Sequence, residues 1–342
     1  MTWLAFDIGG ANIKSADGIA FAESRSFAMW QRPQLLVDTL RAMIAEAPPA
    51  DHLAVTMTGE LADCFATKTE GVLHILAAVE KAADRRHTRV YCSDGTLRAI
   101  EAVRRTPLAA AAANWHALAR FASRFAKQGP ALLIDVGTTT TDLVPLADGV
   151  IAAAENGDGS RSDTHRLIAG EMVYTGVERS PVCAVVGAIP YRGRQCPVAQ
   201  ELFATTWDAY LTLGELPEEP LAAHTADGRP ATKSAARDRL ARAICADRES
   251  FDETDACAAA EAIVQAQTAK IGLALAQQAS RMKSPPATVI LSGLGEFLAR
   301  RVLQRAKFSP TIVSLSEKLG PALSVCAPAH ALAVIAREES QQ

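Results

Sequence analysis

Two short segments of the chain place carboxylates, glycines and hydroxyls at tight turns between apolar runs. The segment LLIDVGTTTTDLVPL, residues 132–146, contains Asp135, Gly137 and four consecutive threonines. A hairpin needs only a residue or two that tolerate the turn, so the threonines exceed what folding requires. Glycines let a backbone approach an anion, threonine hydroxyls add donors, and a carboxylate at a strand end can hold hydrated Mg²⁺ against phosphate oxygens. This turn therefore predicts a phosphate-binding loop.

A second segment repeats the design near the N-terminus, in WLAFDIGGANIKSADG, residues 3–18. Asp7 matches Asp135, and Gly9 matches Gly137. Each segment has an apolar strand, an Asp-Ile-Gly or Asp-Val-Gly, a small polar turn and a second strand that ends in Asp-Gly. The two copies lie too far apart for a tandem solenoid, so we expect two lobes of similar topology.

Strands and helices must alternate around these turns to position them. We expect strands at residues 51–59 and 88–95, and helices at residues 33–47, 71–84, 114–127 and 255–283. The segment ATVILSGLGEFLARRVLQRA then gives a buried strand, a Gly-x-Gly turn and a helix, and residues 326–338 form a last helix. This alternation predicts an α/β fold. The irregular stretch after Gly149 is expected to be ordered and to line a cleft.

The composition excludes several classes of protein. The chain has 342 residues, 49% of them hydrophobic, and a net charge of −3 from 35 basic and 38 acidic residues. The mixed charges leave no footprint for nucleic acid, and no apolar run is long enough for a membrane span or a signal peptide. We therefore expect a cytoplasmic protein with small-molecule partners, for which a homodimer stays open. Seven dispersed cysteines argue against disulfides and zinc, and we expect most of them to be buried.

The two hairpins and the later VILSGLGEF together resemble the actin-like ATPase superfamily. The resemblance implies an actin-like, ribonuclease H-like fold with two lobes and a central cleft between them. Residues 1–128 would form one lobe, with helix 326–338 as a candidate to complete it. Residues 129–325 would form the other lobe, with an inserted irregular and helical segment at about 155–250. The implied phosphate-site residues are Asp7, Gly9, Gly10 and Asn12 in a first loop and Asp135, Gly137, Thr138, Thr139 and Thr140 in a second. Gly293 and Gly295 mark a third turn, which would hold a nucleoside or its equivalent.

Other motifs carry a closer resemblance. AVTMTGELADCF, GEMVYTGVERSPVCA, ELFATTWDAYLTLGELPE and TADGRPA are similar to the hydantoinase/oxoprolinase-related proteins linked to tetrahydromethanopterin-dependent one-carbon transfer. Archaeal members join an aminomethyl-furan-methyl diphosphate to the phenol of glutamyl-tyramine and release pyrophosphate, which makes a methanofuran precursor. Bacterial members belong to pathways that use methylofuran. The resemblance implies a transferase of a furfuryl group, with a furan diphosphate and a tyramine-type phenol as substrates.

The implied reaction assigns roles to particular residues. Asp7 and Asp135 would hold Mg²⁺, the two loops would receive the diphosphate, and Lys14 would add a point charge. The phenol must lose a proton to a base. The candidates for that base are Glu60, Asp63, Asp142, Asp163, His165 and Glu171, and one of these carboxylates could instead be the counter-ion of the aminomethyl group. Glu60 and Glu171 stand out because each follows a Gly in a TGE or AGE turn.

Five arginines of the irregular stretch are further candidates for the diphosphate or a glutamyl carboxylate. They are Arg161, Arg166, Arg179, Arg192 and Arg194, of which we expect one or two in the site and the others in solvent.

Two other functions stay open at this point. One is an ATP-dependent small-molecule kinase or ligase of the actin-like superfamily, with ATP or ADP as its ligand. The other is a regulatory nucleotide-binding protein without chemistry of its own. Ala11 stands where many kinases have a hydroxyl, and LSGLGEF lacks the longer Gly-Gly run common around adenine, so both features favour the transferase.

Overall fold

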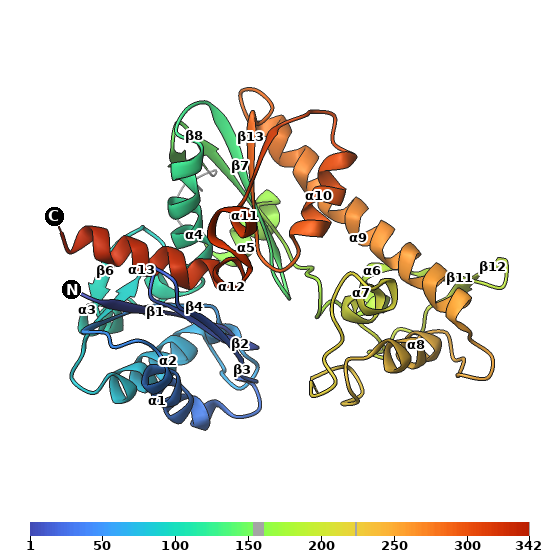
Figure 1. Ribbon diagram of the computed structural model, residues 1–342, viewed down its shortest axis with the longest axis horizontal. Coiled ribbons are helices and arrows are strands. Elements are labelled where there is room, and N and C mark those ends of the chain that lie inside the picture. Colours follow the sequence, from blue (N-terminus) through green and yellow to red (C-terminus); the bar gives the residue numbers. More distant parts are fainter. Residues whose placement is uncertain (153–160, 223, 342) are drawn as a thin grey trace.

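The first lobe is a six-stranded sheet with helices on both faces (Figure 1). The computed structural model describes residues 1–152, 161–222 and 224–341. The strand order is β3-β2-β1-β4-β5-β6, in which β1 pairs antiparallel with β2 and parallel with β4. The strands are β1 (Trp3–Ile8), β2 (Asn12–Ala16), β3 (Ala22–Ser26), β4 (His52–Met57), β5 (His87–Tyr91) and β6 (Leu97–Ala99). Helices α1 (Leu36–Glu46) and α2 (Lys68–Ala83) pack on one face, and α3 (Ile100–Arg105) follows β6.

The second lobe repeats this arrangement. Its sheet has the order β10-β8-β7-β13-β14, and β9 pairs with β8. The strands are β7 (Pro130–Val136), β8 (Thr141–Ala147), β9 (Val150–Ile151), β10 (Met172–Val173), β13 (Thr288–Ser292) and β14 (Thr311–Ser314). In both lobes a central strand therefore has its hairpin partner on one side and a parallel strand on the other. The predicted repeat of topology is confirmed.

Two helices lie between the sheets. They are α4 (Asn114–Ala122) and α13 (Ala327–Glu339). Residues of α13 from Ala327 to Ala336 are all buried, because one side of the helix packs near Trp3 and Ala5 while the other meets Leu133 and Ile290. A helix that is apolar around its whole circumference suits this position between two sheets.

A segment inserted between β8 and β13 forms a further helical unit beside the second lobe (Figure 1). The segment begins with α5 (Asp163–Ala169), which packs on β10 near the sheet. The helical unit contains α6 (Val182–Val185), the hairpin of β11 (Ala188–Tyr191) and β12 (Arg194–Pro197), α7 (Thr206–Leu213) and α8 (Lys233–Arg242). Helix α9 (Glu253–Arg281) connects this unit back to the sheet. The buried Arg239 links it internally, with Nε 2.7 Å from Asp208 and Nη1 3.0 Å from Asp227. The expected start of the insertion near residue 155 lies outside the described residues, and the lobe boundaries stay a prediction.

The remaining helices of the second lobe are α10 (Glu296–Gln304), α11 (Leu315–Leu319) and α12 (Pro321–Val325). Two of the predicted helices differ at their ends. Helix α2 begins three residues early because the Thr67 side chain caps it by accepting from the N–H of Glu70. Helix α4 ends at Ala122, and a short 3₁₀ turn continues to Phe125.

The prediction that most cysteines are buried is wrong. Only Cys92 and Cys326 are buried among the seven, and all seven are free thiols. Cys257 lies on the exposed side of α9, and Cys245 occupies a turn with φ of +59°. In the part of the chain that the structure describes, no helix combines the length and the apolar character needed to cross a membrane.

Candidate functional site

The two Asp-Gly hairpins have the same backbone geometry. The N–H of Gly9 donates to the carbonyl of Asn12 at 2.9 Å, and the N–H of Gly137 donates to the carbonyl of Thr140 at 2.9 Å. A Cβ on Gly9 would lie 2.7 Å from the Asn12 carbonyl oxygen, so this turn requires glycine. The predicted loops therefore form a matched pair, one in each lobe.

A following segment lies against each loop. In the first lobe the N–H of Met29 donates to the carbonyl of Gly10 at 2.9 Å. In the second lobe the N–H groups of Glu178 and Arg179 both donate to the carbonyl of Thr138 at 3.0 Å. Part of the irregular stretch thus borders the second loop. A Cβ on Gly176 would lie 2.5 Å from the backbone of Thr138, so this segment packs directly on the loop.

The carboxylates of Asp7 and Asp135 lie near the ends of the central strands, and the charge of Asp7 is close enough to raise the pKa of Asp135. Burial raises the pKa of Asp7, while Lys14 and Asn114 oppose the increase. Burial raises the pKa of Asp135 to about 6, and the nearby Asp142 and Asp7 add to the increase. Asn114 donates to Oδ2 of Asp7 at 3.4 Å, whereas Oδ1 is buried without a hydrogen-bond partner. A carboxylate whose negative charge raises the pKa of a second one nearby favours a cation close to both.

A hydroxyl stands beside each carboxylate on the neighbouring parallel strand. Thr56 is the register partner of Asp7, and Ser292 is the register partner of Asp135. Both hydroxyls are buried without a hydrogen-bond partner, although Ser292 is near enough to lower the pKa of Asp135. No group of three or more His, Cys, Asp or Glu side chains forms a metal cage within the described residues. Mg²⁺ keeps several waters in proteins and binds through one or two carboxylates and substrate phosphates. The two carboxylates, each with an unpartnered hydroxyl on the neighbouring strand, are a ligand set of this kind.

The two hairpins differ at one register position. Lys14 pairs with Asp7 across the first hairpin, and Asp142 pairs with Asp135 across the second. The charge of Lys14 lowers the pKa of both Asp7 and Asp135, so this lysine lies near both carboxylates. Asp142 instead forms a buried ion pair with Arg166 at 2.7 Å, and the Arg166 guanidinium lies 4.2 Å from the centre of the Trp115 ring.

Glu60 is buried just behind the first loop. Its side chain belongs to a residue that is 1% exposed, and neither carboxylate oxygen has a hydrogen-bond partner among the described residues. Burial raises its pKa to about 7, and the charge of Asp163 adds to the increase. This increase in pKa is opposed by the backbone N–H groups of Glu60 and Ala112 and by the charge of Lys68. Neither N–H group is placed well enough to form a hydrogen bond with the carboxylate. A Cβ on Gly71 would lie 2.3 Å from the Glu60 carbonyl oxygen, so α2 closes over this residue.

The other base candidates are spread over both lobes. Asp163 at the start of α5 forms an ion pair with Lys68 of α2 at 2.7 Å, which connects the two lobes next to Glu60. Glu171 is buried, and its backbone pairs with Arg166 and Leu143. Asp63 is exposed.

His165 has Nδ1 3.2 Å from the Ser162 hydroxyl, at the start of α5. The roles predicted for these residues stay predictions.

The third glycine-rich turn packs against the second hairpin. The N–H of Gly295 donates to the carbonyl of Val136 at 2.9 Å. Gly293 has φ of +87°, and a Cβ there would lie 2.8 Å from Oδ1 of Asp135. Gly293 therefore leaves room for the Asp135 carboxylate, whereas Gly295 allows close packing on Val136 and Val177. Whether they also border a nucleoside stays a prediction.

Sequence reasoning missed Glu178 and Trp30. Burial raises the pKa of Glu178 to about 7, Glu219 adds to the increase, and Lys14 and Arg179 oppose it. The Arg179 guanidinium lies 4.6 Å from the centre of the Trp30 ring, so a residue of the second lobe stacks on one of the first. Only contact with Lys14 and with the second loop identifies Glu178, and a single sequence does not reveal such contacts.

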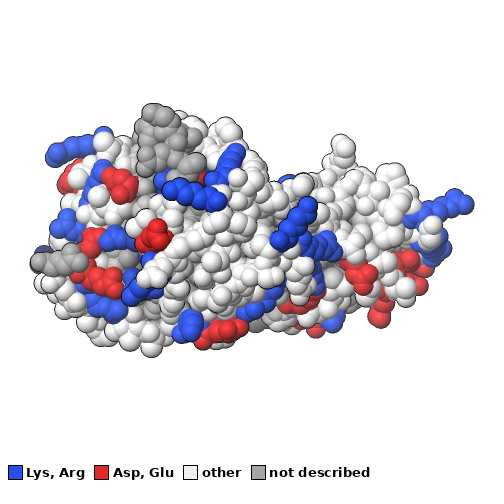
Figure 2. Space-filling model, turned by 90° about the horizontal axis from the view of Figure 1, so that it is seen from above, with Lys and Arg blue, Asp and Glu red and all other residues white. Residues whose placement is uncertain are grey.

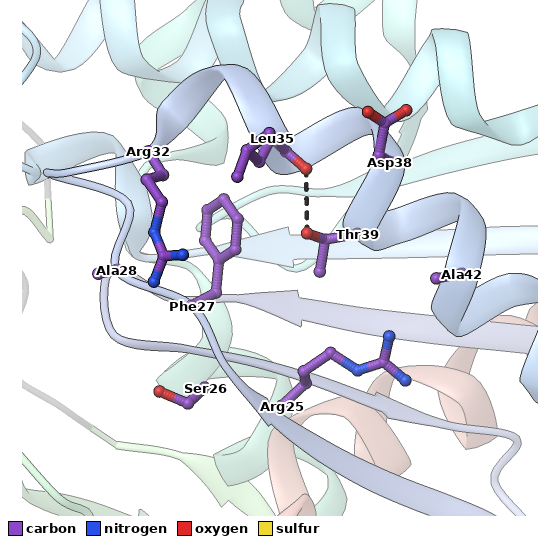
Figure 3. A pocket seen from close by; sticks show the side chains of 9 residues that line it. All are labelled: Arg25, Ser26, Phe27, Ala28, Arg32, Leu35, Asp38, Thr39 and Ala42. Atoms are coloured by element: carbon purple, nitrogen blue, oxygen red, sulfur yellow. Dashed lines mark hydrogen bonds between the residues drawn. The ribbon is translucent and has the colours of Figure 1, made fainter. Parts of the chain in front are cut away.

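A cavity of about 350 Å³ opens elsewhere on the first lobe, between β3 and α1 (Figure 3). Arg25, Phe27, Arg32 and Thr39 line it, with the Thr39 hydroxyl donating to the Leu35 carbonyl at 3.0 Å. It contains none of the predicted site residues. On the face shown in Figure 2, basic and acidic side chains are interspersed, with wide uncharged areas between them.

Comparison with known proteins gives a consistent result. The family model described as hydantoinase/oxoprolinase matches residues 51–339. A protein of Methanocaldococcus jannaschii named (4-{4-[2-(gamma-L-glutamylamino)ethyl]phenoxymethyl}furan-2-yl)methanamine synthase is 32% identical over 98% of this chain and 98% of its own length. The protein of the same name from Methanococcus vannielii is 26% identical over 61% of this chain and 91% of its own.

Solved structures confirm the predicted two-lobed actin-like fold. A nucleotide-free acetone carboxylase matches 94% of this chain with a TM-score of 0.50 and 13% identity, and this chain spans about half of that longer protein (51%). The PilM–PilN pilus biogenesis complex also gives a TM-score of 0.50, with 12% identity over 97% of each chain.

Proposed function

The chain belongs to the hydantoinase/oxoprolinase family, and on that premise we propose that it is an enzyme of methanofuran-type cofactor biosynthesis. The relative from Methanocaldococcus jannaschii, which this chain matches over almost its whole length, is named for a product in which a phenol oxygen is joined to a furan-bound methyl carbon. We infer that this chain forms the same type of ether. The observation that carries the proposal is the pair of matched hairpins, whose carboxylates Asp7 and Asp135 are buried and near enough for Asp7 to raise the pKa of Asp135.

The proposed reaction displaces diphosphate from a furfuryl carbon. The phenol oxygen forms a bond to that carbon, the bond between the carbon and the diphosphate oxygen breaks, and pyrophosphate leaves with the electron pair. The furan oxygen shares the positive charge that develops on the carbon. The enzyme must therefore neutralise the charge that accumulates on the leaving group.

The hairpin residues suit that task. Backbone N–H groups of both loops and the hydroxyls of Thr138 and Thr139 are available to bind the diphosphate, and the Lys14 ammonium adds a positive charge. Asp7 and Asp135 would hold Mg²⁺, which supplies charge neutralisation on the departing oxygens when bound.

We assign the general base to Glu60. A base that works near neutral pH needs a pKa near 7, which burial gives to this side chain. Asp142 is a weaker candidate, because its ion pair with Arg166 would have to break before it could hold a proton. The proton that Glu60 accepts comes from the phenol hydroxyl.

The test is a pyrophosphate-release assay with Mg²⁺, the furan diphosphate and γ-glutamyltyramine, with the ether product followed by mass spectrometry. We expect pyrophosphate and ether in equal amounts. Asp7→Asn and Asp135→Asn should each lower turnover at least a hundredfold, because each removes one of two proposed metal ligands, while circular dichroism stays unchanged. Consumption of ATP with release of ADP would support the kinase or ligase instead. Near-normal turnover in both variants would remove the two carboxylates from the metal role.

A further inference from the structure

Beside the two proposed phosphate loops lies an aromatic and cationic contact, between Trp30 and Arg179, that the proposed reaction does not use. Trp30 follows Met29, whose N–H is bonded to the first loop, and Arg179 is bonded by its own N–H to the second loop. The Trp30–Arg179 contact therefore lies between the two segments that border the diphosphate loops. It brings together two parts of the chain that fold in different lobes.

The inserted unit contributes to the same surface. The N–H of Trp207 lies 3.4 Å from the carbonyl of Glu178, and the Trp207 ring is 4.9 Å from the ring of His224. Burial lowers the pKa of His224, Glu219 opposes the decrease, and the nearby charge of Arg179 adds to it. Three parts of the molecule thus meet around one arginine.

Arg179 is unusual among the arginines of this region. Arg166, Arg192 and others have carboxylate or carbonyl partners, whereas Arg179 is exposed and forms no ion pair in the described part of the chain. A guanidinium that stacks on an indole keeps its N–H groups free for a planar anion. A half-buried aromatic ring next to an exposed guanidinium without an ion-pair partner among the described residues is a surface that an aromatic molecule with a carboxylate would fit.

We propose that Trp30 and Arg179 select the acceptor: the indole packs against the phenol ring, and the guanidinium binds a carboxylate on the acceptor's tail. This inference rests on the proposed function, since the acceptor is the phenol of that reaction. The product name of the relatives gives such a tail, a glutamyl group joined to the ring through an ethylamino linker. The linker is flexible, so the tail can turn back to an arginine anchored beside the diphosphate loop.

The experiment compares two acceptors that differ only in one carboxylate. They are γ-glutamyltyramine and 4-aminobutanoyl-tyramine. Arg179→Gln should raise the KM for γ-glutamyltyramine about tenfold to a hundredfold, the usual effect of losing a charge-assisted hydrogen bond. It should leave the KM for 4-aminobutanoyl-tyramine and for the furan diphosphate within about twofold. Trp30→Leu should raise the KM for both acceptors by a similar factor, about threefold to tenfold.

A matched control is Arg192→Gln. Arg192 also stacks on an aromatic ring, with its guanidinium 5.1 Å from the centre of the Tyr191 ring, but it lies on the β11–β12 hairpin. It should change neither KM. A rise in the KM for the furan diphosphate in Arg179→Gln would place this arginine on the donor and overturn the proposal, as would equal effects on the two acceptors.

Binding of each acceptor without the donor, measured by calorimetry, separates this inference from the reaction itself. The wild-type protein should bind γ-glutamyltyramine more tightly than 4-aminobutanoyl-tyramine, and Arg179→Gln should remove that difference. If the wild type binds the two equally, the inference fails whatever the reaction. If the difference is present but no pyrophosphate is released, the proposed reaction fails and the assignment of Arg179 stands.

Discussion

Replacing Glu60 by Gln should make the protein more stable at alkaline pH and less active. In the folded protein the pKa of Glu60 rises from its ordinary 4.5 to about 7, because the carboxylate is buried without a hydrogen-bond partner. Between these two values the folded state binds more protons than the unfolded state, so the free energy of unfolding falls as the pH rises. The stability is present below pH 4.5 and is lost by about pH 7. At 1.36 kcal/mol per pH unit the full loss is about 3 kcal/mol.

Gln has the same shape and is neutral at every pH, so Glu60→Gln removes this loss. The stability of the variant relative to the wild type should grow by about 2–3 kcal/mol between pH 5 and pH 8. The 342 residues give an unfolding entropy of about 0.7 kcal/mol/K, so the difference in Tm should grow by about 3–4 °C. Any free-energy cost of burying the amide of the new Gln side chain would be the same at pH 5 and pH 8, so it would cancel from the change between the two pH values. Turnover should fall about a hundredfold to ten-thousandfold if the carboxylate is the base.

Thermal unfolding at pH 5, 6.5 and 8 measures the first effect, and pyrophosphate release measures the second. Glu261→Gln is the control, because Glu261 is exposed on α9 and its replacement should leave the difference in Tm constant with pH. A constant difference for Glu60→Gln would refute the raised pKa. A pH-dependent gain in stability with unchanged turnover would keep the buried carboxylate but remove its catalytic role.

Two further predictions concern the surroundings of Glu60. Both Asp163→Asn and Lys68→Met break the interlobe ion pair, yet they should move the acidic limb of the pH–rate profile in opposite directions. Asp163→Asn should move it toward lower pH, because it removes a charge that raises the pKa of Glu60. Lys68→Met should move it toward higher pH, because it removes a charge that lowers that pKa. Shifts of the same sign would mean that the ion pair acts through structure alone. Gly71→Ala should lower the free energy of unfolding by about 1–3 kcal/mol, since its Cβ would lie 2.3 Å from the Glu60 carbonyl oxygen. Gly272→Ala is the control, because no atom in the described part of the chain lies within 4 Å of a Cβ there, and it should raise the free energy of unfolding by up to about 1 kcal/mol. Urea unfolding measures both variants, and equal effects of Gly71→Ala and Gly272→Ala would argue against close packing of α2 on Glu60.

The sequence predicted the fold well because its signals are local. Asp-Gly turns, apolar strands and capped helices depend on neighbouring residues, and the hairpins at Asp7 and Asp135 form as expected. The arrangement of the site depends on contacts between distant residues. Nothing adjacent to Arg166 in the sequence shows that it pairs with Asp142, and nothing near Trp30 shows that Arg179 lies on it.

The repeat between the lobes supplies an argument about Glu60 that neither hairpin gives alone. Counting from the hydroxyl beside each carboxylate, Glu60 is four residues after Thr56, and Glu296 is four residues after Ser292. Glu296 has partners: the Ser314 hydroxyl donates to Oε2 at 2.5 Å, and the N–H of Ser316 donates to Oε1 at 2.9 Å.

The fold can therefore supply hydrogen-bond donors to a glutamate at this position, but among the described residues it does so for Glu296 in the second lobe and not for Glu60 in the first. If Glu60 served the structure alone, donors like those of Glu296, or an apolar side chain, would make the first lobe more stable. Burying the Glu60 carboxylate without a hydrogen-bond donor costs stability. That cost is expected for a side chain whose function is to accept a proton from the substrate. A variant that places a hydrogen-bond donor beside the Glu60 carboxylate should thus be more stable and turn over more slowly than the wild type.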